Sequence, residues 1–496
     1  MSETPRPVTR ELCDWIARLT LPEIPVDQAT RVKYLILDGL ACALIGARLP
    51  WSEAAVQGIL SMESGGNCGI IGWDTKIGPL AAALLNSTFI QGFELDDYHR
   101  EAPIHSSAVV LPTLLAVLEH CHASTETPPL TGADFLLAAI AGYETGPRIG
   151  LGVYGIEVLS RGWHSGAIFG PAAAAAAATK LLQLPATNIE DAMGIACTQA
   201  GGLMSAQYES TVKRMQHGFA ARNGLFAAYM ARSGYIGIKQ VLERPYGGFL
   251  STFSLGNGLT PAYLPDRVVE GLGTRWEIDQ IVVKPYASMA ATHGTIDCLM
   301  ALQATYPSQM AAVDRIRRIM VEMSEPAFKK GGWAPIRPLT VTGAQMSATY
   351  AAAMQLLEGE VQPAQFAPAQ LERDDVWALM SKIQCVHNQS FDTSVGGIYQ
   401  QRIHVELDGS DREGDGQDQF QTLTEYVVAP RGNRVPLSND DILNKWRRIT
   451  AGVIDPGRQA AIETTVLNLE KVQDMRQLTR LLYGPTKNIF EAEEAQ

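Results

Sequence analysis

The sequence predicts a mainly α protein, in which a large all-helical domain carries a smaller α+β domain inserted before its last helices. Apolar residues recur at the helical period through most of the first half, alternating apolar and polar residues follow, and helical patterns return after Pro436. A chain of 496 residues is also too long for one compact core. We therefore predict a helical domain formed by 1–270 and 431–496, and an α+β domain at 271–430.

Helices are expected where apolar residues repeat every three or four positions or where long apolar runs lie between turn signals. Many of these segments are rich in alanine and glycine, and small side chains let helix axes approach closely in a bundle. The seven alanines of 172–178 are expected to lie in a central helix. In the first domain the predicted helices are 27–47, 79–93, 108–118, 133–142, 168–182, 190–203 and 217–233.

The second domain is expected to combine strands with helices. Segment 315–323 alternates partly between apolar and charged residues, and 402–428 is typical of a β-hairpin around the turn-rich Asp408-Gly409-Ser410-Asp411. A further strand is predicted at 276–283. The predicted helices are 289–306 and 347–357 in this domain, and 440–451, 459–469 and 473–482 after it.

Composition argues against several classes of function. The formal net charge of −12 disfavours a nucleic-acid partner, which needs a basic surface. No apolar run approaches the ~20 residues of a membrane span and the N-terminus lacks the apolar core of a secretion signal, so we expect a cytoplasmic protein with no membrane contact. The 7 cysteines are scattered and never form C-x-x-C, which favours reduced thiols over disulfides.

The sequence contains no convincing cofactor or metal motif. Gly150-x-Gly152-x-x-Gly155 has the letters of a dinucleotide fingerprint, but it follows a helical pattern instead of a strand. The members of His120-Cys121-His122 are adjacent along a predicted helix end, so their side chains would not share a face as metal ligands do. We expect no cofactor and no metal, and any chemistry must come from side chains alone.

Segment 94–107 holds the densest concentration of such side chains. Four carboxylates, two imidazoles and one arginine lie there between two apolar segments: Glu94, Asp96, Asp97, Glu101, His99, His105 and Arg100. Proton donors and acceptors on a helix-to-helix connection are a candidate acid/base site. A solvated loop is the alternative interpretation.

Three more segments gather suitable groups. His164 lies in 162–166, at the expected entrance of the alanine-rich helix, where it could contact an anion or cap the helix. Segment 211–217 places Lys213, Arg214 and a histidine before another predicted helix, and an exposed cationic turn is the alternative there. Lys284 ends an apolar segment, where its charge would either need an anion or reach the surface.

Long motifs link these segments to one family. They are ELDDYH at 94–99, APIHS at 102–106, GWH at 162–164, ACTQA at 196–200, GLMSAQY at 202–208, VKR at 212–214, HGFAARNG at 217–224 and LERPYGGF at 242–249. On these motifs the chain resembles the MmgE/PrpD family, and within it the fungal enzymes that decarboxylate cis-aconitate. The similarity runs from about residue 8 to about residue 485, and its motifs are long.

The resemblance implies a helical domain with an α+β lid domain, a homodimer, and no metal or organic cofactor. It also implies a carboxy-lyase that converts cis-aconitate to itaconate and CO2. Position by position, catalytic roles fall on His105 as proton donor, His164, Lys213, Lys284 and Tyr350, and the acidic site residue falls on Glu94 or Asp96. Asp97, Tyr98 and Arg214 are further candidates for substrate binding. Relatives in animals carry Asp where Glu94 stands and have a loop one residue shorter, which leaves the roles of Glu94, Asp97, Tyr98 and His99 open.

The chemistry suits these residue types. cis-Aconitate carries three carboxylates, so its site needs cations, here Lys213, Lys284 and Arg214, and one general acid. Imidazole, as in His105, is such an acid because its ordinary pKa lies near 6.5. Two alternatives stay open: a dehydratase of the same family acting on 2-methylcitrate or a related hydroxy-tricarboxylate, and a non-catalytic helical binding scaffold. Separate positions for the histidines and lysines would favour the scaffold.

Overall fold

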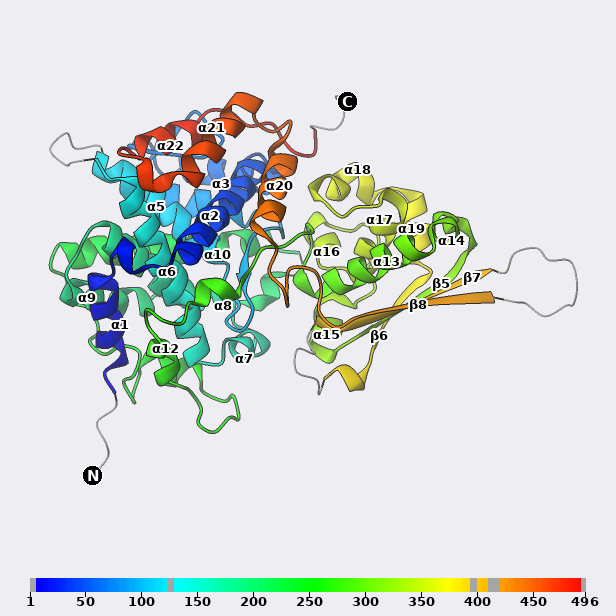
Figure 1. Cartoon of the computed structure of the whole chain (residues 1–496), viewed down its shortest axis with the longest axis horizontal. Helices are drawn as coiled ribbons and strands as arrows, with labels where there is room; N and C mark the ends of the chain where they lie inside the picture. Colours follow the sequence, from blue (N-terminus) through cyan, green and yellow to red (C-terminus); the bar gives the residue numbers. More distant parts are fainter. Residues whose placement is uncertain (1–5, 123–128, 208, 393–398, 409–419, 492–496) are drawn as a thin grey trace, which may run out of the picture. The chain divides into compact units, whose positions relative to one another are not determined.

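The chain divides into two compact units, each held together by its own internal contacts (Figure 1). The computed structural model describes residues 6–122, 129–207, 209–392, 399–408 and 420–491. Unit 1 comprises Met1–Ala206, Thr211–Val283 and Ser438–Ala495, and unit 2 comprises Gln207–Ser210 and Lys284–Leu437. Helices predominate in both units, so the predicted mainly α fold class is confirmed.

Unit 1 is a helical bundle built around α8 (Ser165–Leu181). This helix packs against α5 (Ser106–His122), α6 (Gly132–Gly152) and α10 (Val212–Arg232), and its seven consecutive alanines are all buried. Methyl side chains let the neighbouring helices approach it closely. The other helices of unit 1 are α1 (Val8–Arg18), α2 (Val26–Gly46), α3 (Pro50–Leu60), α4 (Pro79–Ile90), α7 (Gly155–Ser160), α9 (Ala186–Cys197), α11 (Phe249–Phe253), α12 (Asp266–Val269), α20 (Asn439–Thr450), α21 (Pro456–Leu467) and α22 (Arg476–Leu482).

The predicted helices of unit 1 are all present, with three clear differences in their bounds. α6 continues to Gly152, ten residues beyond the predicted end at residue 142. α10 begins at Val212, five residues before the predicted start, because the two cations that suggested a turn lie in its first turn. α9 ends at Cys197, and turns replace the last part of the predicted helix 190–203. The letters of the dinucleotide fingerprint fall at the end of α6 and the start of α7, without a preceding strand.

Two short antiparallel ladders complete unit 1. One pairs β1 (Cys68–Gly69) with β2 (Lys76–Ile77), and the other pairs β3 (Tyr98–His99) with β4 (Ile281–Val282). The predicted strand 276–283 is wrong for most of its length, because Glu277–Gln280 forms a 3-10 helix and only the last residues pair. Since β4 pairs with β3, segment 271–283 belongs to unit 1, whereas the sequence placed it in the α+β domain.

Unit 2 contains a four-stranded mixed sheet in the order β6-β5-β7-β8. β5 (Ile316–Met323) pairs in parallel with β6 (Ile383–His387) and antiparallel with β7 (Gln401–Asp408), which in turn pairs with β8 (Phe420–Val427). The predicted hairpin 402–428 is confirmed, and residues 409–411 of its predicted turn lie outside the described residues. β6 was not predicted. The helices of unit 2 are α13 (His293–Thr305), α14 (Pro307–Ala311), α15 (Glu325–Gly331), α16 (Val341–Gln345), α17 (Ala348–Glu358), α18 (Pro368–Leu371) and α19 (Asp374–Met380).

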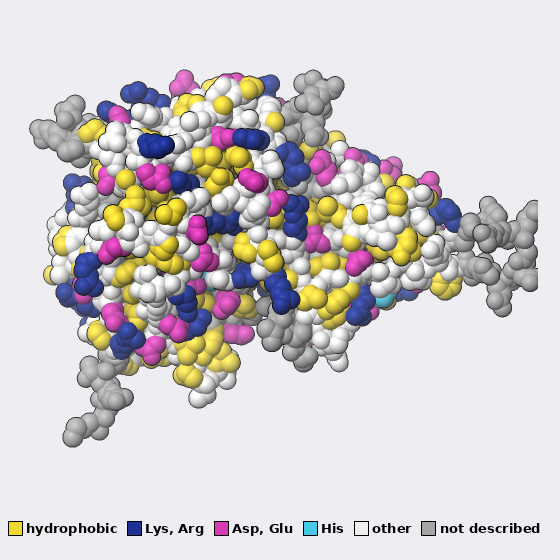
Figure 2. All heavy atoms as spheres, viewed as in Figure 1, with side chains coloured by type: hydrophobic (Ala, Val, Ile, Leu, Met, Phe, Trp, Pro, Cys, Tyr) yellow, Lys and Arg dark blue, Asp and Glu magenta, His cyan; other side chains and the backbone are white. Residues whose placement is uncertain are grey.

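The helices of unit 2 cover the sheet: α13 packs on β7 and β8, and α17 packs on β6. On the face drawn in Figure 2, Lys and Arg side chains are interspersed with Asp and Glu. Within the described residues, no helix has both the length and the hydropathy that crossing a bilayer requires.

Candidate active site

The predicted acid/base loop connects α4 to α5 and is buried over most of its length. His99, in the middle of the loop, makes three hydrogen bonds. Its backbone N–H donates to the carbonyl of Ile104 (3.0 Å), and its ring Nδ1 accepts from the N–H of Ala102 (3.0 Å). Its ring Nε2 donates to Glu277 Oε2 (3.2 Å). A solvated loop is therefore the wrong description. Since both ring nitrogens of His99 are bonded, we expect this histidine to shape the loop.

Two further features hold the loop against the rest of unit 1. Burial opposes a charge on Glu277, but the hydrogen bonds of His99 and Arg275, together with the charge of Arg275, outweigh burial and lower the pKa of this carboxyl to about 2. The carboxylate that holds His99 is thus ionised at neutral pH. On the other side, a Cβ at Gly150 of α6 would lie only 2.5 Å from the Cβ of Ala102. A glycine is needed there because the loop passes so close to the helix.

His105 ends the loop and is oriented by a buried carboxylate. Its Nδ1 donates a hydrogen bond to Oδ2 of Asp96 over 2.9 Å, and the two side chains are 18% and 0% exposed. A carboxylate on Nδ1 keeps a proton on that nitrogen, fixes the direction of its N–H bond and leaves Nε2 as the nitrogen on the other side of the ring. This is the geometry that a histidine needs to present one proton in a fixed direction.

His164 is the N-cap residue of α8, and its Nδ1 accepts a hydrogen bond from the N–H of Ala167 over 3.3 Å. Burial, followed by the positive charges of Lys213 and His105, lowers the pKa of His164 to about 3. The ring is therefore neutral at physiological pH and carries its proton on Nε2. The capping interpretation is confirmed, and the remaining N–H is a neutral donor suited to an anionic ligand.

Lys213 and Arg214 share one carboxylate, that of Glu94. Lys213 Nζ and Arg214 Nη1 (2.7 Å) both contact Glu94 Oε1, and all three residues are buried. The exposed cationic turn is thus wrong. Cations in the first turn of a helix oppose its dipole, so the carboxylate offsets an unfavourable placement. Together these three groups carry one net positive charge, which favours an anionic ligand nearby.

Asp97 is a fully buried loop residue whose side chain contacts the first turn of α5. Its carboxyl oxygens accept from the backbone N–H of Ser107 (3.1 Å) and from the Ser107 hydroxyl (2.7 Å), and that hydroxyl also contacts the Tyr143 hydroxyl (2.5 Å). Burial, followed by the charge of Asp96, raises the pKa of Asp97 to about 8 despite these hydrogen bonds. We expect Asp97 to anchor the helix that follows His105, a role that its predicted contact with substrate does not describe.

Asp97→Asn is expected to reduce the slope with which the free energy of unfolding falls as pH rises. The folded state holds the Asp97 proton up to about pH 8, whereas an unfolded Asp releases it near 3.9. Between these values the folded state binds more protons, so stability falls as pH rises, by at most about 1.4 kcal/mol per pH unit. An amide has no proton to release. Urea unfolding between about pH 6 and pH 8 measures both slopes.

The matched control for this measurement is Asp266→Asn, whose side chain is 77% exposed. It should keep the slope of the wild type, because this side chain stays largely exposed when the protein folds. Parallel curves for Asp97→Asn and the wild type would show that Asp97 is ionised in the folded protein.

The remaining predicted site residues are less directly placed. Tyr98 is a buried strand residue of β3, opposite Val282. Lys284 and Tyr350 are buried residues of unit 2, and the Tyr350 hydroxyl donates to the carbonyl of Gln365 over 2.6 Å. Their predicted roles beside His105 stay predictions.

His105, His164 and Lys213 form a cluster with a residue that was not predicted as a site residue, His217. Its ring lies between two predicted site residues, with ring centroids 4.8 Å from His105 and 4.7 Å from His164. The sequence carried one usable signal, because His217 follows Lys213 by four residues and so shares its helix face.

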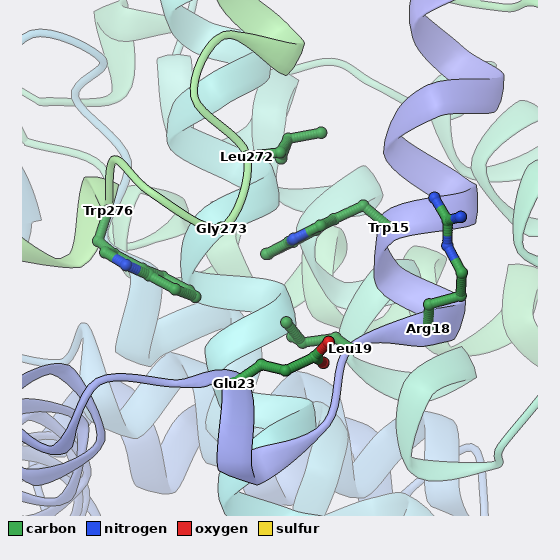
Figure 3. Close-up of a pocket in the computed structure, with 7 residues that line it drawn as sticks. All are labelled: Trp15, Arg18, Leu19, Glu23, Leu272, Gly273 and Trp276. Atoms are coloured by element: carbon green, nitrogen blue, oxygen red, sulfur yellow. The ribbon is translucent and has the colours of Figure 1, made fainter.

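Figure 3 shows a cavity of about 390 Å³ elsewhere in unit 1. The indole rings of Trp15 and Trp276 point into it from two sides, with centroids 6.2 Å apart. It is lined by Trp15, Arg18, Leu19, Glu23, Leu272, Gly273 and Trp276. It includes none of the predicted catalytic or substrate-binding residues.

The His120-Cys121-His122 cluster has other partners. The His120 ring packs on the ring of Tyr229 (centroids 5.1 Å apart), Cys121 Sγ lies 3.8 Å from the Tyr229 hydroxyl, and His122 Nε2 accepts from the N–H of Leu130 (3.1 Å). In the part of the chain that the structure describes, no three His, Cys, Asp or Glu side chains are grouped as metal ligands would be.

Comparisons with known proteins cover nearly the whole chain. Residues 10–262 match the MmgE/PrpD N-terminal domain, and residues 286–471 match the MmgE/PrpD C-terminal domain. The chain is 48% identical over 480 residues to cis-aconitate decarboxylase-like protein oryM of Aspergillus oryzae, covering 96% of this chain and 97% of the relative. It is 45% identical over 487 residues to cis-aconitate decarboxylase of Aspergillus terreus (97% of each chain), and 28% identical over 466 residues to that of Homo sapiens (92% and 90%).

Proposed function

Because the chain belongs to the MmgE/PrpD family, we propose that it is a carboxy-lyase that converts cis-aconitate to itaconate and CO2. The observation that carries the proposal is the similarity, over nearly the full length of both chains, to proteins named cis-aconitate decarboxylase. The geometry of unit 1 supports it, because His105, His164 and Lys213 belong to one cluster with His217. A scaffold without catalysis would need no such cluster.

The cluster suits the two demands of this reaction. cis-Aconitate is a trianion, and one ionic contact at 4 Å is worth about 4 kcal/mol at an effective dielectric of 20, before desolvation costs. Lys213, Arg214 and Glu94 supply a net positive charge, and His164 supplies a neutral N–H donor. These groups would bind carboxylates of the substrate and would not donate a proton in the reaction.

The reaction needs one proton in a defined place. The C–C bond to the carboxylate on the CH2 arm breaks and releases CO2, and its electron pair forms a new C=C bond. The original double bond moves its electrons to the far carbon, which takes a proton, while the transient charge spreads onto the attached carboxylate. We assign that proton to His105, whose ring Asp96 holds in place. The unsaturation of the substrate accepts the electrons.

Purified protein given cis-aconitate should release CO2 and accumulate itaconate, both of which chromatography and gas analysis can measure. The nearest alternative is a dehydratase of the same family that acts on 2-methylcitrate or citrate. The proposal fails if cis-aconitate survives while a hydroxy-tricarboxylate loses water. Assays with all three compounds, under the same buffer and protein concentration, separate the two activities.

Several parts of the proposal rest on sequence. Lys284 and Tyr350 are proposed to contribute a cation and a hydroxyl, and unit 2 is proposed to act as a lid. The homodimer is also a proposal, and exposed apolar side chains of unit 1, among them Ile236 (75% exposed) and Tyr246 (97%), support it. A cytoplasmic location stays a prediction from the sequence.

A further inference from the structure

His217 lies at the centre of the histidine cluster. The side chain is 0% exposed, and its ring is tilted by 67° to that of His105 and by 76° to that of His164, so both contacts are edge-to-face. Edge-to-face contacts between rings are directional, because the ring edge is positive and the face negative. The ring of His217 therefore restrains both neighbours in angle as well as in distance.

The helix opposite is shaped to admit this ring. Gly166 is the second residue of α8, and a Cβ built on it would lie 2.1 Å from Nε2 of His217 and 2.6 Å from its Cδ2. Any larger residue at this position would displace the ring, since real Cβ atoms do not approach other atoms so closely. A glycine inside a helix costs stability relative to alanine, so room for His217 is gained at a local cost.

The ring also lacks the partners that a merely structural histidine has. Among the described residues, none hydrogen-bonds either ring nitrogen of His217, although both nitrogens are buried. His99 offers the contrast, because both of its ring nitrogens are bonded. A buried polar group without a partner is unfavourable for folding. Burial first, and then electrostatic interactions with His164, His105 and Lys213, hold the pKa of His217 well below its usual range, so the ring is neutral at physiological pH.

We propose that His217 is a positioning residue of the active site, whose ring is wedged between His105 and His164 and sets the orientation of both. The inference rests on the proposed function, because it gives His105 the proton transfer. His217 acts through His105: Asp96 holds the Nδ1 side of that ring, and His217 holds its plane. A misplacement of about 1 Å in a reacting group can cost about 100-fold in rate.

Kinetics of three variants test the proposal. His217→Ala removes the wedge and is expected to lower kcat for cis-aconitate about 10- to 100-fold with little change in KM, because the cations that bind the substrate remain. His217→Phe keeps a flat ring and should recover most of kcat, whereas His217→Asn keeps polar atoms without a ring and should not. Wild-type kcat in His217→Ala, or recovery by Asn and not by Phe, would overturn the proposal.

A double-mutant cycle tests the wedge without using activity. Gly166→Ala should lower the urea midpoint of the otherwise unchanged protein, because its methyl group collides with His217, but should not lower it in the His217→Ala background. Equal shifts in both backgrounds would show that the ring does not occupy the space above Gly166.

Crystal structures of the His217 variants give a readout that survives failure of the proposed function. In His217→Ala the ring of His105 should rotate from its present plane, and in His217→Phe it should keep that plane. If the wild type does not decarboxylate cis-aconitate, the proposed function fails while this result still decides whether His217 positions His105. An unchanged His105 ring in His217→Ala would refute the positioning role.

Discussion

His105→Ala is expected to keep its fold and to lose about 10²- to 10⁴-fold of the turnover of cis-aconitate, because a positioned general acid contributes a factor of that size. The side chain is partly exposed and is hydrogen-bonded to Asp96, so its removal leaves no large cavity in the core. Initial rates of itaconate formation measure the loss. Circular dichroism and thermal unfolding of the same samples show whether the fold is kept.

Two further variants separate the acid from the histidine as such. His105→Asn keeps a donor for Asp96 but has no proton to give at neutral pH, so it should be as slow as His105→Ala. His120→Ala removes an exposed histidine from α5, the helix that follows His105, and should leave the rate unchanged. Full activity in His105→Ala or His105→Asn would remove the proposed role.

Glu94→Ala is expected to destabilise the protein by about 3–5 kcal/mol, the usual cost of removing one partner from a buried ion pair. Lys213 and Arg214 would remain buried in the first turn of α10 without this carboxylate, and the helix dipole would oppose both. Urea unfolding followed by circular dichroism measures the change in the free energy of unfolding.

The matched control for Glu94→Ala is Glu101→Ala, from the same loop. Glu101 is 64% exposed and its ion pair with Arg267 is 3.9 Å long, so its loss should cost less than about 1 kcal/mol. A tricarboxylate such as citrate should restore part of the stability of Glu94→Ala, and more than it adds to the wild type, because a bound anion replaces the missing charge. A small loss, or no gain with citrate, would contradict a cationic substrate site.

The helices of unit 1 could be predicted because their apolar pattern is long and repeated. Segment 276–283 could not, because its apolar letters serve two different structures: a 3-10 helix tied to His99 through Glu277, and a two-residue strand that needs β3 as its partner. Partners so far apart in sequence leave no local signal. β6 was not predicted for the same reason, because its place beside β5 depends on a parallel pairing between distant segments.

In the candidate site too, some residues could be predicted from the sequence and some contacts could not. Lys213 and His105 were found through motifs, whose residue types suit the chemistry. The pairing of Lys213 with Glu94 joins residues 119 positions apart, and no spacing along the chain predicts it. His217 was not predicted as a site residue, because its burial depends on the missing side chain of Gly166, in another helix. Such roles arise from packing between helices, which one sequence does not display.

The small ladder between β3 and β4 also limits where the chain can be truncated or joined to a domain of a relative. Unit 1 is discontinuous, and the pieces that hold the His105 loop in place include residues up to Val283. A shortened chain that stops at residue 270 would lose Glu277, the anchor of His99, together with the strand that pairs with Tyr98. Domain exchange between relatives should therefore be made after Val283, so that the acid/base loop and its anchor come from the same parent.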